Sequence, residues 1–270
     1  MRIILLYLLA FSIIPNIAES LEIIRGKPLQ GGLLVLKVDN DSKLTVNGET
    51  IPVSLNGKAI VGFHRDEKEP LHLIETLRDG SKKELILKPK LRVYQEQRIN
   101  GLPKNMVTPP EKVLKRIRED RKQVAKARSY LTSINGFEKV FSWPIKGIIT
   151  GTYGTKRILN GKPRAPHYGI DIAAPKGTPV RAPQAGIIRM AKNLYFTGLT
   201  IILDHGHGLS STFLHLSGTK IKVGQRVQKN QIIGNVGSTG RSTGPHLDWR
   251  INLLKKRLDP HLIAGTMPKK

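Results

Sequence analysis

From Phe141 to the C-terminus, glycine and proline recur every few residues between short apolar runs, and no helical period is sustained. This pattern is typical of a β-rich domain with many turns. The sequence therefore predicts a β domain over residues 141–270. The strands expected in it are Gly147–Thr152, His167–Ala173, Pro179–Ile188, Thr200–Asp204, Thr212–Leu216, Ile232–Gly237 and His246–Leu253.

Residues 21–100 show a second set of short strands. Gly31–Val38 is a strand candidate, and Asn47-Gly48 lies between the short segments Lys43–Val46 and Thr50–Val53, which predicts a hairpin with a type I′ turn. Asn56-Gly57 and Asp79-Gly80 indicate two further tight turns. Strands at this spacing favour a small immunoglobulin-like β-sandwich. No catalytic pattern occurs in this part, so we expect an accessory domain.

Residues 101–140 differ from both β-rich parts. The segment from Glu111 to about Ile134 has a broken apolar stripe, with Thr108 as the expected cap and Asn135-Gly136 as the expected end. It predicts a basic helix that connects the two domains. Its lysines and arginines could contact an anionic partner, although a solvated helix face is the commoner explanation.

The N-terminus has the features of a secretory signal peptide. Met1-Arg2 precedes the apolar run Ile3–Ile14, and the small, polar stretch Ala18–Ser20 follows. We therefore assign residues 1–20 to a signal peptide cleaved near Ser20 and expect a periplasmic or secreted protein. An uncleaved membrane anchor is the alternative. No later segment is long and apolar enough to span a bilayer, so the mature chain is expected to lack a transmembrane segment.

The charge balance limits the partners. With 45 basic and 20 acidic residues the formal net charge is +25, which favours a polyanion such as nucleic acid, anionic lipid or an acidic cell-wall polymer. Aromatic residues make up only 5% and no nucleic-acid-binding motif occurs, so nucleic acid is not expected as a partner. Cysteine is absent, so a bound metal would need His, Asp or Glu ligands.

Two pairs of metal-type side chains occur in the C-terminal domain. His246 and Asp248 are two residues apart in a predicted strand, so their side chains would share one face. His167 and Asp171, upstream, are four residues apart in another predicted strand, so their side chains would also share one face. Two such pairs in one domain make a metal site the leading hypothesis.

Four motifs follow one another in the C-terminal domain, namely His167-x-x-x-Asp171, the strand Thr212–Ser217, the segment Ile221–Gly234 and Gly237–His246. In these motifs and in their order the domain resembles the lysostaphin-type (LytM-domain) zinc metallopeptidases. The resemblance covers about residues 142–260 and implies an antiparallel β domain that cuts peptide cross-bridges of peptidoglycan. The preceding β domain and helix resemble, less specifically, the accessory region of exported Gram-negative members.

The resemblance also implies roles for five residues. His167 and Asp171 would bind one zinc ion, and His215 and His246 would flank the attacking water. The third ligand maps onto Asp248, where the family usually has histidine. A second carboxylate would weaken the metal as a Lewis acid and favour harder divalent metals such as manganese.

Other candidate features receive structural interpretations. His205 and His207, in the run Asp204–Gly208, are expected in a hairpin turn. The glycine-rich loop Gly234–Gly244 lacks a phosphate-loop ending and is expected to form the wall of a groove. Tyr153, Arg157 and Arg164 could line that groove.

The predicted function is a metal-dependent endopeptidase acting on the stem-peptide cross-links of peptidoglycan. A different class of protein remains open, because some LytM-type domains lack metal ligands and instead bind and activate a cell-wall amidase. The missing histidine at position 248 favours this alternative, whereas the presence of His167, Asp171, His215 and His246 favours the enzyme. A module that only binds an anionic polymer is a third possibility and rests on charge alone.

Overall fold

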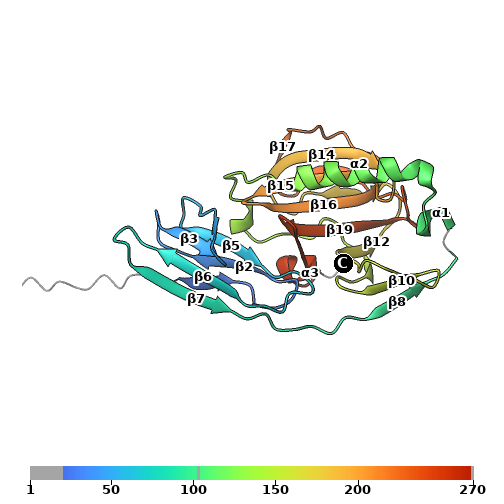
Figure 1. Cartoon of the computed structure of the whole chain (residues 1–270). Coiled ribbons are helices and arrows are strands. Elements are labelled where there is room, and N and C mark those ends of the chain that lie inside the picture. The colour runs from blue at the N-terminus through green and yellow to red at the C-terminus, as the bar shows by residue number, and fades with distance from the viewer. Residues whose placement is uncertain (1–20, 102–103, 269–270) are drawn as a thin grey trace, which may run out of the picture.

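The computed structural model describes residues 21–101 and 104–268, and the predicted signal peptide lies outside these ranges. The fold is mainly β, as expected, with two β units and a long helix (Figure 1). Within the described ranges, no helix combines the length and apolar character needed to cross a bilayer. The domain boundaries at residues 100 and 140 stay predictions.

The N-terminal unit consists of two antiparallel sheets. Its three-stranded sheet has the order β1 (Glu22–Arg25), β2 (Leu33–Lys37), β5 (Lys58–Gly62). Its four-stranded sheet has the order β4 (Glu49–Ile51), β3 (Lys43–Val46), β6 (Leu71–Thr76), β7 (Lys82–Leu87). The predicted hairpin at Asn47-Gly48 joins β3 to β4, and both residues have positive φ. Asn56-Gly57 and Asp79-Gly80 precede β5 and β7, as predicted.

The C-terminal unit is built on one large antiparallel sheet with the strand order β17-β14-β15-β16-β19-β12-β9, and β20 pairs with β19. The bounds of these strands are β9 (Ile148–Gly151), β12 (Ile170–Ala173), β14 (Gly186–Leu194), β15 (Gly198–Gly206), β16 (Leu209–Leu216), β17 (Arg226–Val227), β19 (His246–Leu253) and β20 (Lys256–Leu258).

Two small sheets flank it. One pairs β13 (Pro179–Arg181) with β18 (Ile232–Asn235). The other has the order β11 (Lys162–Arg164), β10 (Lys156–Leu159), β8 (Glu96–Ile99), with β8 parallel to β10. The short helices are α1 (Lys104–Val107), the 3₁₀ helix η1 (Gly136–Glu138) and α3 (Pro260–Ala264).

Two predicted strands differ from those observed. Pro179–Ile188 is not one strand, because β13 pairs with β18 whereas β14 belongs to the large sheet. Pro183 lies in the break, where it has no N–H to donate to a ladder. His167–Ala173 is also shorter than predicted, since β12 begins only at Ile170.

The long helix α2 (Glu111–Arg128) lies across β14 and β15 (Figure 1). The predictions of Thr108 as cap and of an end near Ile134 were wrong. Pro110 is the N-cap, and the side chain of Ser129 bonds back to the Lys126 carbonyl at 3.0 Å. The following residues leave the helix because they contact the large sheet, where Thr132 accepts a backbone hydrogen bond from His207.

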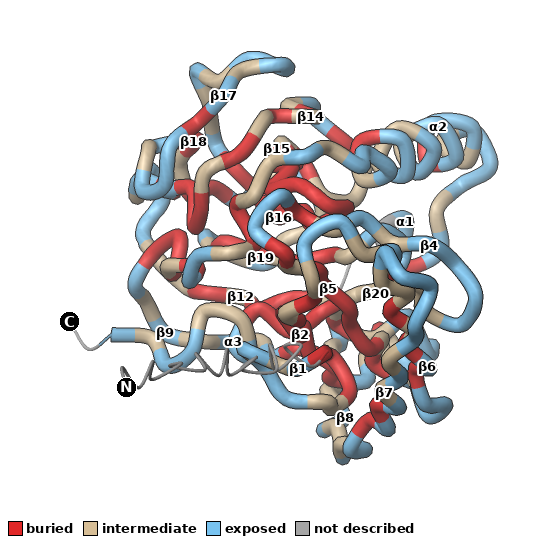
Figure 2. Tube along the Cα trace, turned by 90° about the vertical axis from the view of Figure 1, so that its left-hand side faces the viewer, coloured by how far each residue is buried: buried red, intermediate tan, exposed pale blue. Residues whose placement is uncertain are grey.

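The two β units share a hydrophobic core. Leu34 and Leu36 of β2 pack inside the N-terminal unit, whereas Leu33 and Val35 pack with the large sheet. Because successive side chains of a strand point to opposite faces, the uninterrupted apolar run of β2 serves both cores. In Figure 2 buried residues lie along β2 and β5 as well as the large sheet, while most of α2 is exposed. The N-terminal unit is therefore packed against the C-terminal one.

The predicted turn at His207 is present. His207 and Gly208 join β15 to β16, and both have positive φ. His205 is fully buried, with Nδ1 2.9 Å from the Ala185 carbonyl oxygen and Nε2 2.9 Å from Ser211 Oγ. Both histidines thus lie in the hairpin and its base.

His205 makes the free energy of unfolding of the protein depend on pH. Burial lowers its pKa to about 4, so between pH 6.5 and 4 the unfolded chain binds a proton that the native protein does not. Stability is lost as pH falls through this range. From pH 7.5 to 5 we expect a loss of about 2 kcal/mol from this residue. Urea denaturation at both pH values should show a correspondingly smaller loss for His205→Asn, whose amide can still donate to Ala185. Equal losses in both proteins would contradict the assignment.

Candidate metal centre

Two adjacent strands of the large sheet position the acidic residues of the site. β12 pairs with β19 in a register that places Asp171 directly opposite Asp248. Directly opposed residues of an antiparallel pair project to the same side of the sheet, so the two carboxylates face each other. Gly151 and Gly169 leave room for them, because a Cβ would lie 2.4 Å from Asp171 Oδ2 at position 151 and 2.6 Å from Asp248 Oδ1 at position 169.

His167 reaches the same place from a loop. The prediction that it shares a strand with Asp171 was wrong, because its backbone lies before β12 and bonds instead to Thr155 and Gly154. Its side chain is only 1% exposed, and neither ring nitrogen has a hydrogen-bond partner. Nε2 lies 3.0 Å from Asp171 Oδ1, but the two atoms are not aligned for a hydrogen bond, so this oxygen also has no hydrogen-bond partner.

These three side chains fit a metal ion. His167, Asp171 and Asp248 can each offer one ligand atom, and these atoms lie within 4.8 Å of one another. Buried polar atoms are normally satisfied by hydrogen bonds, so the unsatisfied atoms of His167 and Asp171 indicate a missing partner. One imidazole and two carboxylates form a donor set that zinc accepts.

Each carboxylate of the site also has an arginine partner. Arg250 Nε lies 2.9 Å from Asp248 Oδ1, and Nη2 lies 2.5 Å from Oδ2. Arg157 Nη2 donates to Asp171 Oδ2 at 2.8 Å. Burial would raise the pKa of Asp248, but the charge and hydrogen bonds of Arg250 hold it well below its usual value. Asp248 is therefore a carboxylate whose two oxygens are both engaged, and a metal ion would compete with Arg250 for it.

Two further histidines lie beside this group, with ring centroids 4.8 Å apart. His215 Nδ1 lies 2.7 Å from the Thr239 carbonyl oxygen, and His246 Nδ1 lies 2.8 Å from that of Gly244. Since a carbonyl only accepts, each Nδ1 carries the proton and each neutral ring has an unprotonated Nε2. Burial lowers the pKa of His215, which favours its neutral form. His246 Nε2 is 3.9 Å from Asp171 Oδ1.

The site opens into a cavity of about 360 Å³. One wall is the loop Arg241–Pro245, the end of the glycine-rich stretch expected to form a groove, and Arg157 also lines the cavity. Gln97 and Ile99 of β8 add a wall from the segment that precedes α1. Tyr153 was wrongly expected here, because it is buried and donates its hydroxyl to the Arg257 carbonyl. Arg164 bonds to the Val107 carbonyl.

The sequence prediction missed Arg250. Its position two residues after Asp248, in the same strand, places both side chains on one face, so the strand period could have revealed the pair. Nothing in the sequence indicates that β8 would form a wall of the cavity, because its parallel pairing with β10 joins segments about 60 residues apart.

Comparisons with known proteins agree on the family. Peptidase family M23 matches residues 165–260. The chain is 37% identical over 123 residues to the peptidoglycan DD-endopeptidase ShyA of Vibrio cholerae, covering 43% of this chain and 26% of ShyA. It is 39% identical over 103 residues to the DD-carboxypeptidase/endopeptidase Mpg of Neisseria meningitidis, covering 38% of this chain and 24% of Mpg. The chain thus spans about a quarter of the length of these relatives.

One solved structure extends the similarity beyond this domain. A Pseudomonas aeruginosa protein named for peptidase M23 superposes with a TM-score of 0.68 at 27% identity, covering 88% of this chain and 96% of that one. The matched part of this chain includes the N-terminal unit as well as the large sheet. The sequence motifs, the facing carboxylates and these matches lead to one conclusion: residues 165–260 of this chain form a peptidase family M23 domain.

Proposed function

We propose that this protein is a metal-dependent endopeptidase that hydrolyses peptide cross-links of peptidoglycan. The observation that carries the proposal is the set of unsatisfied, buried atoms of His167 and Asp171, which lie beside two histidines with unprotonated Nε2 atoms. The activity named for ShyA and Mpg supports the substrate class. A periplasmic or secreted location follows from that substrate and from the predicted signal peptide.

His167, Asp171 and Asp248 would hold the metal, with zinc as the first choice. A bound zinc ion would polarise the scissile carbonyl and lower the pKa of a water molecule. His215 accepts the proton of the attacking water at Nε2, because burial keeps its ring neutral and the Thr239 carbonyl fixes its tautomer. Its imidazolium then protonates the leaving amine. His246 lies beside His215 and would donate to the developing oxyanion only as an imidazolium, in which both ring nitrogens carry protons.

The oxygen-rich ligand set also affects the choice of metal. Two carboxylates balance the charge of a divalent ion, and Arg250 competes for one of them. We therefore expect weaker zinc binding than at a site with two histidines, and measurable activity with manganese.

The test is muropeptide release from purified sacculi by residues 21–270. After EDTA treatment and dialysis we expect no release, and excess zinc or manganese should restore it. New amine ends detected by mass spectrometry would identify peptide hydrolysis. Folded protein, verified by circular dichroism, that releases nothing with zinc, manganese or cobalt would contradict the proposal.

A second candidate function is activation of a cell-wall amidase by a domain without catalysis of its own. The observation that favours it is the engagement of both Asp248 oxygens by Arg250. The same preparation, added to a purified amidase with sacculi, separates the two functions. Enhanced cleavage of the amide bond to the glycan, without any peptide cross-link cleavage, would establish the regulator.

A further inference from the structure

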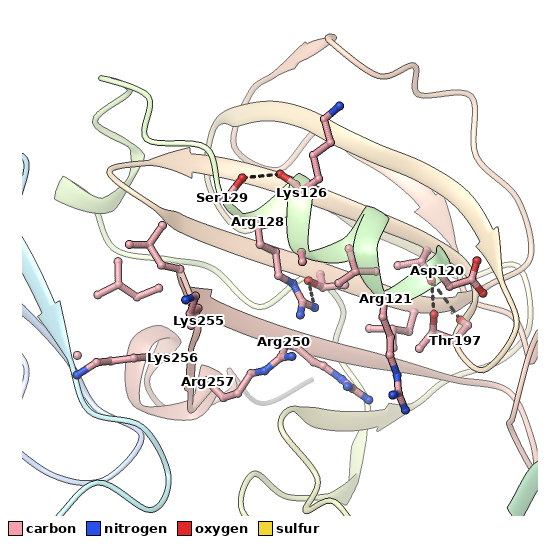
Figure 3. A pocket seen from close by; sticks show the side chains of 18 of the residues that line it. Asp120, Arg121, Lys126, Arg128, Ser129, Thr197, Arg250, Lys255, Lys256 and Arg257 are labelled. Carbon is pink, nitrogen blue, oxygen red and sulfur yellow. Dashed lines mark hydrogen bonds between the residues drawn. The ribbon is translucent and has the colours of Figure 1, made fainter. Parts of the chain in front are cut away.

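A second and larger cavity lies beneath α2. It has a volume of about 1380 Å³ and extends between α2, the N-terminal strands β4 and β5, and the β19–β20 hairpin (Figure 3). Eight basic and two acidic side chains line it, so its net charge is strongly positive. Arg241 lines both this cavity and that of the candidate metal centre, so the two are neighbours.

Three arginines converge in this cavity. Arg128 points from α2 toward β19, while Arg250 and Arg257 extend from β19 and β20 (Figure 3). The guanidinium of Arg250 is paired with Asp248. Arg128 donates to Thr212 Oγ1 at 2.9 Å, but its Nε is buried with no hydrogen-bond partner. Arg257 Nη1 is likewise buried without a partner.

The cluster is short of negative charge. Burial lowers the pKa of Arg128 well below its usual value, and the charges of Arg257 and Arg250 lower it further. Burial is the main cause that lowers the pKa of Arg257 to about 10, and the positive charge of Arg250 is the second. Asp248 is the acidic group that offsets this repulsion at Arg128, and both of its oxygens already bond to Arg250. Partly buried guanidinium groups that repel one another are costly unless an anion binds them.

We propose that this cavity binds an acidic peptide, with Arg128 and Arg257 contacting its carboxylates. Guanidinium groups bind carboxylates through paired hydrogen bonds, and both arginines line this cavity. Apolar side chains such as Val61, Leu71 and Ile117 also line the cavity, which suits a peptide better than a small inorganic anion. The choice of a peptide rests on the proposed function, since a substrate strand leaving the metal centre would pass Arg241 and enter this cavity.

Calorimetric titration of chelator-treated protein (residues 21–270) tests the proposal. The probe is acetyl-Ala-Glu-Glu-Ala-amide, and its counterpart has glutamine at both glutamate positions. We expect only the glutamate peptide to bind. Loss of one charged hydrogen-bonding group should weaken binding about tenfold in Arg128→Gln. The matched control is Arg118→Gln on the exposed face of the same helix, outside the cavity, for which we expect a change of less than about twofold.

The thermal midpoint gives a second readout. Without peptide, Arg128→Gln should melt higher than the wild type because it removes repulsion from Arg250 and Arg257, whereas loss of a merely structural arginine would lower the midpoint. Equal weakening in Arg118→Gln would overturn the proposal, as would equal binding of the glutamine peptide or full displacement of the peptide by inorganic phosphate. Because chelator is present and no bond is cut, this result is independent of whether sacculi are hydrolysed.

Discussion

Asp248→Asn is expected to lower the free energy of unfolding of the metal-free protein by about 3–5 kcal/mol, because it leaves the charge of Arg250 without its partner in a poorly solvated place. Asp248 is 2% exposed and Arg250 22% exposed in this pair. Urea denaturation at pH 7 in the presence of chelator measures the loss.

Two variants control this experiment. Asp171→Asn breaks a pair in which the carboxylate is 14% exposed rather than 2% exposed, so water solvates the arginine that is left and we expect a smaller loss. Asp248→Asn combined with Arg250→Gln removes both charges and should recover much of the stability. If Asp248→Asn alone has the same free energy of unfolding as the wild type, the buried charge of Arg250 is not stabilised by Asp248.

The second large effect concerns catalysis. His215→Asn should reduce the rate of cross-link hydrolysis about a thousandfold, the usual contribution of a general base, which is the role that we propose for His215. Asparagine is chosen because residue 215 has a φ of 63°, which asparagine tolerates better than alanine does. The loss should appear in the maximal rate, with zinc binding unchanged.

The matched control is His64→Asn, a half-buried histidine of the N-terminal unit that lines neither cavity. It should retain activity close to that of the wild type. A loss below about tenfold in His215→Asn would assign the proton transfer to another group, with His246 as the first candidate.

Local signals predicted much of the fold. Asn47-Gly48 defines a hairpin because its backbone geometry requires positive φ at both residues. The strand His246–Leu253 was predicted with its observed bounds, and the i, i+2 spacing correctly placed His246 and Asp248 together. Motifs of the family indicated which five side chains converge, although their roles stay proposals.

Features that depend on distant contacts were not predictable in this way. The helix was expected to continue to Ile134, but contacts between Thr132 and the β15–β16 turn draw the chain away after Arg128. Tyr153 was expected in a groove because it precedes the ligand motif, yet it is buried, with its ring edge-to-face against Tyr94 and its hydroxyl donating to the Arg257 carbonyl. In both cases tertiary packing determines the outcome, and neither composition nor periodicity reports it.

The position of β19 has a consequence for how the protein folds. This strand lies between β16 and β12 although it is formed by residues 246–253, near the end of the chain. Until β19 docks, β12 is not connected by hydrogen bonds to β14, β15 and β16. The sheet therefore exists as two separate pieces. Such pairing between distant segments is slow. Pulse-labelling hydrogen exchange during refolding should therefore show the β12 amides that bond to β19 becoming protected together with those of β19, after the β14–β16 meander has formed.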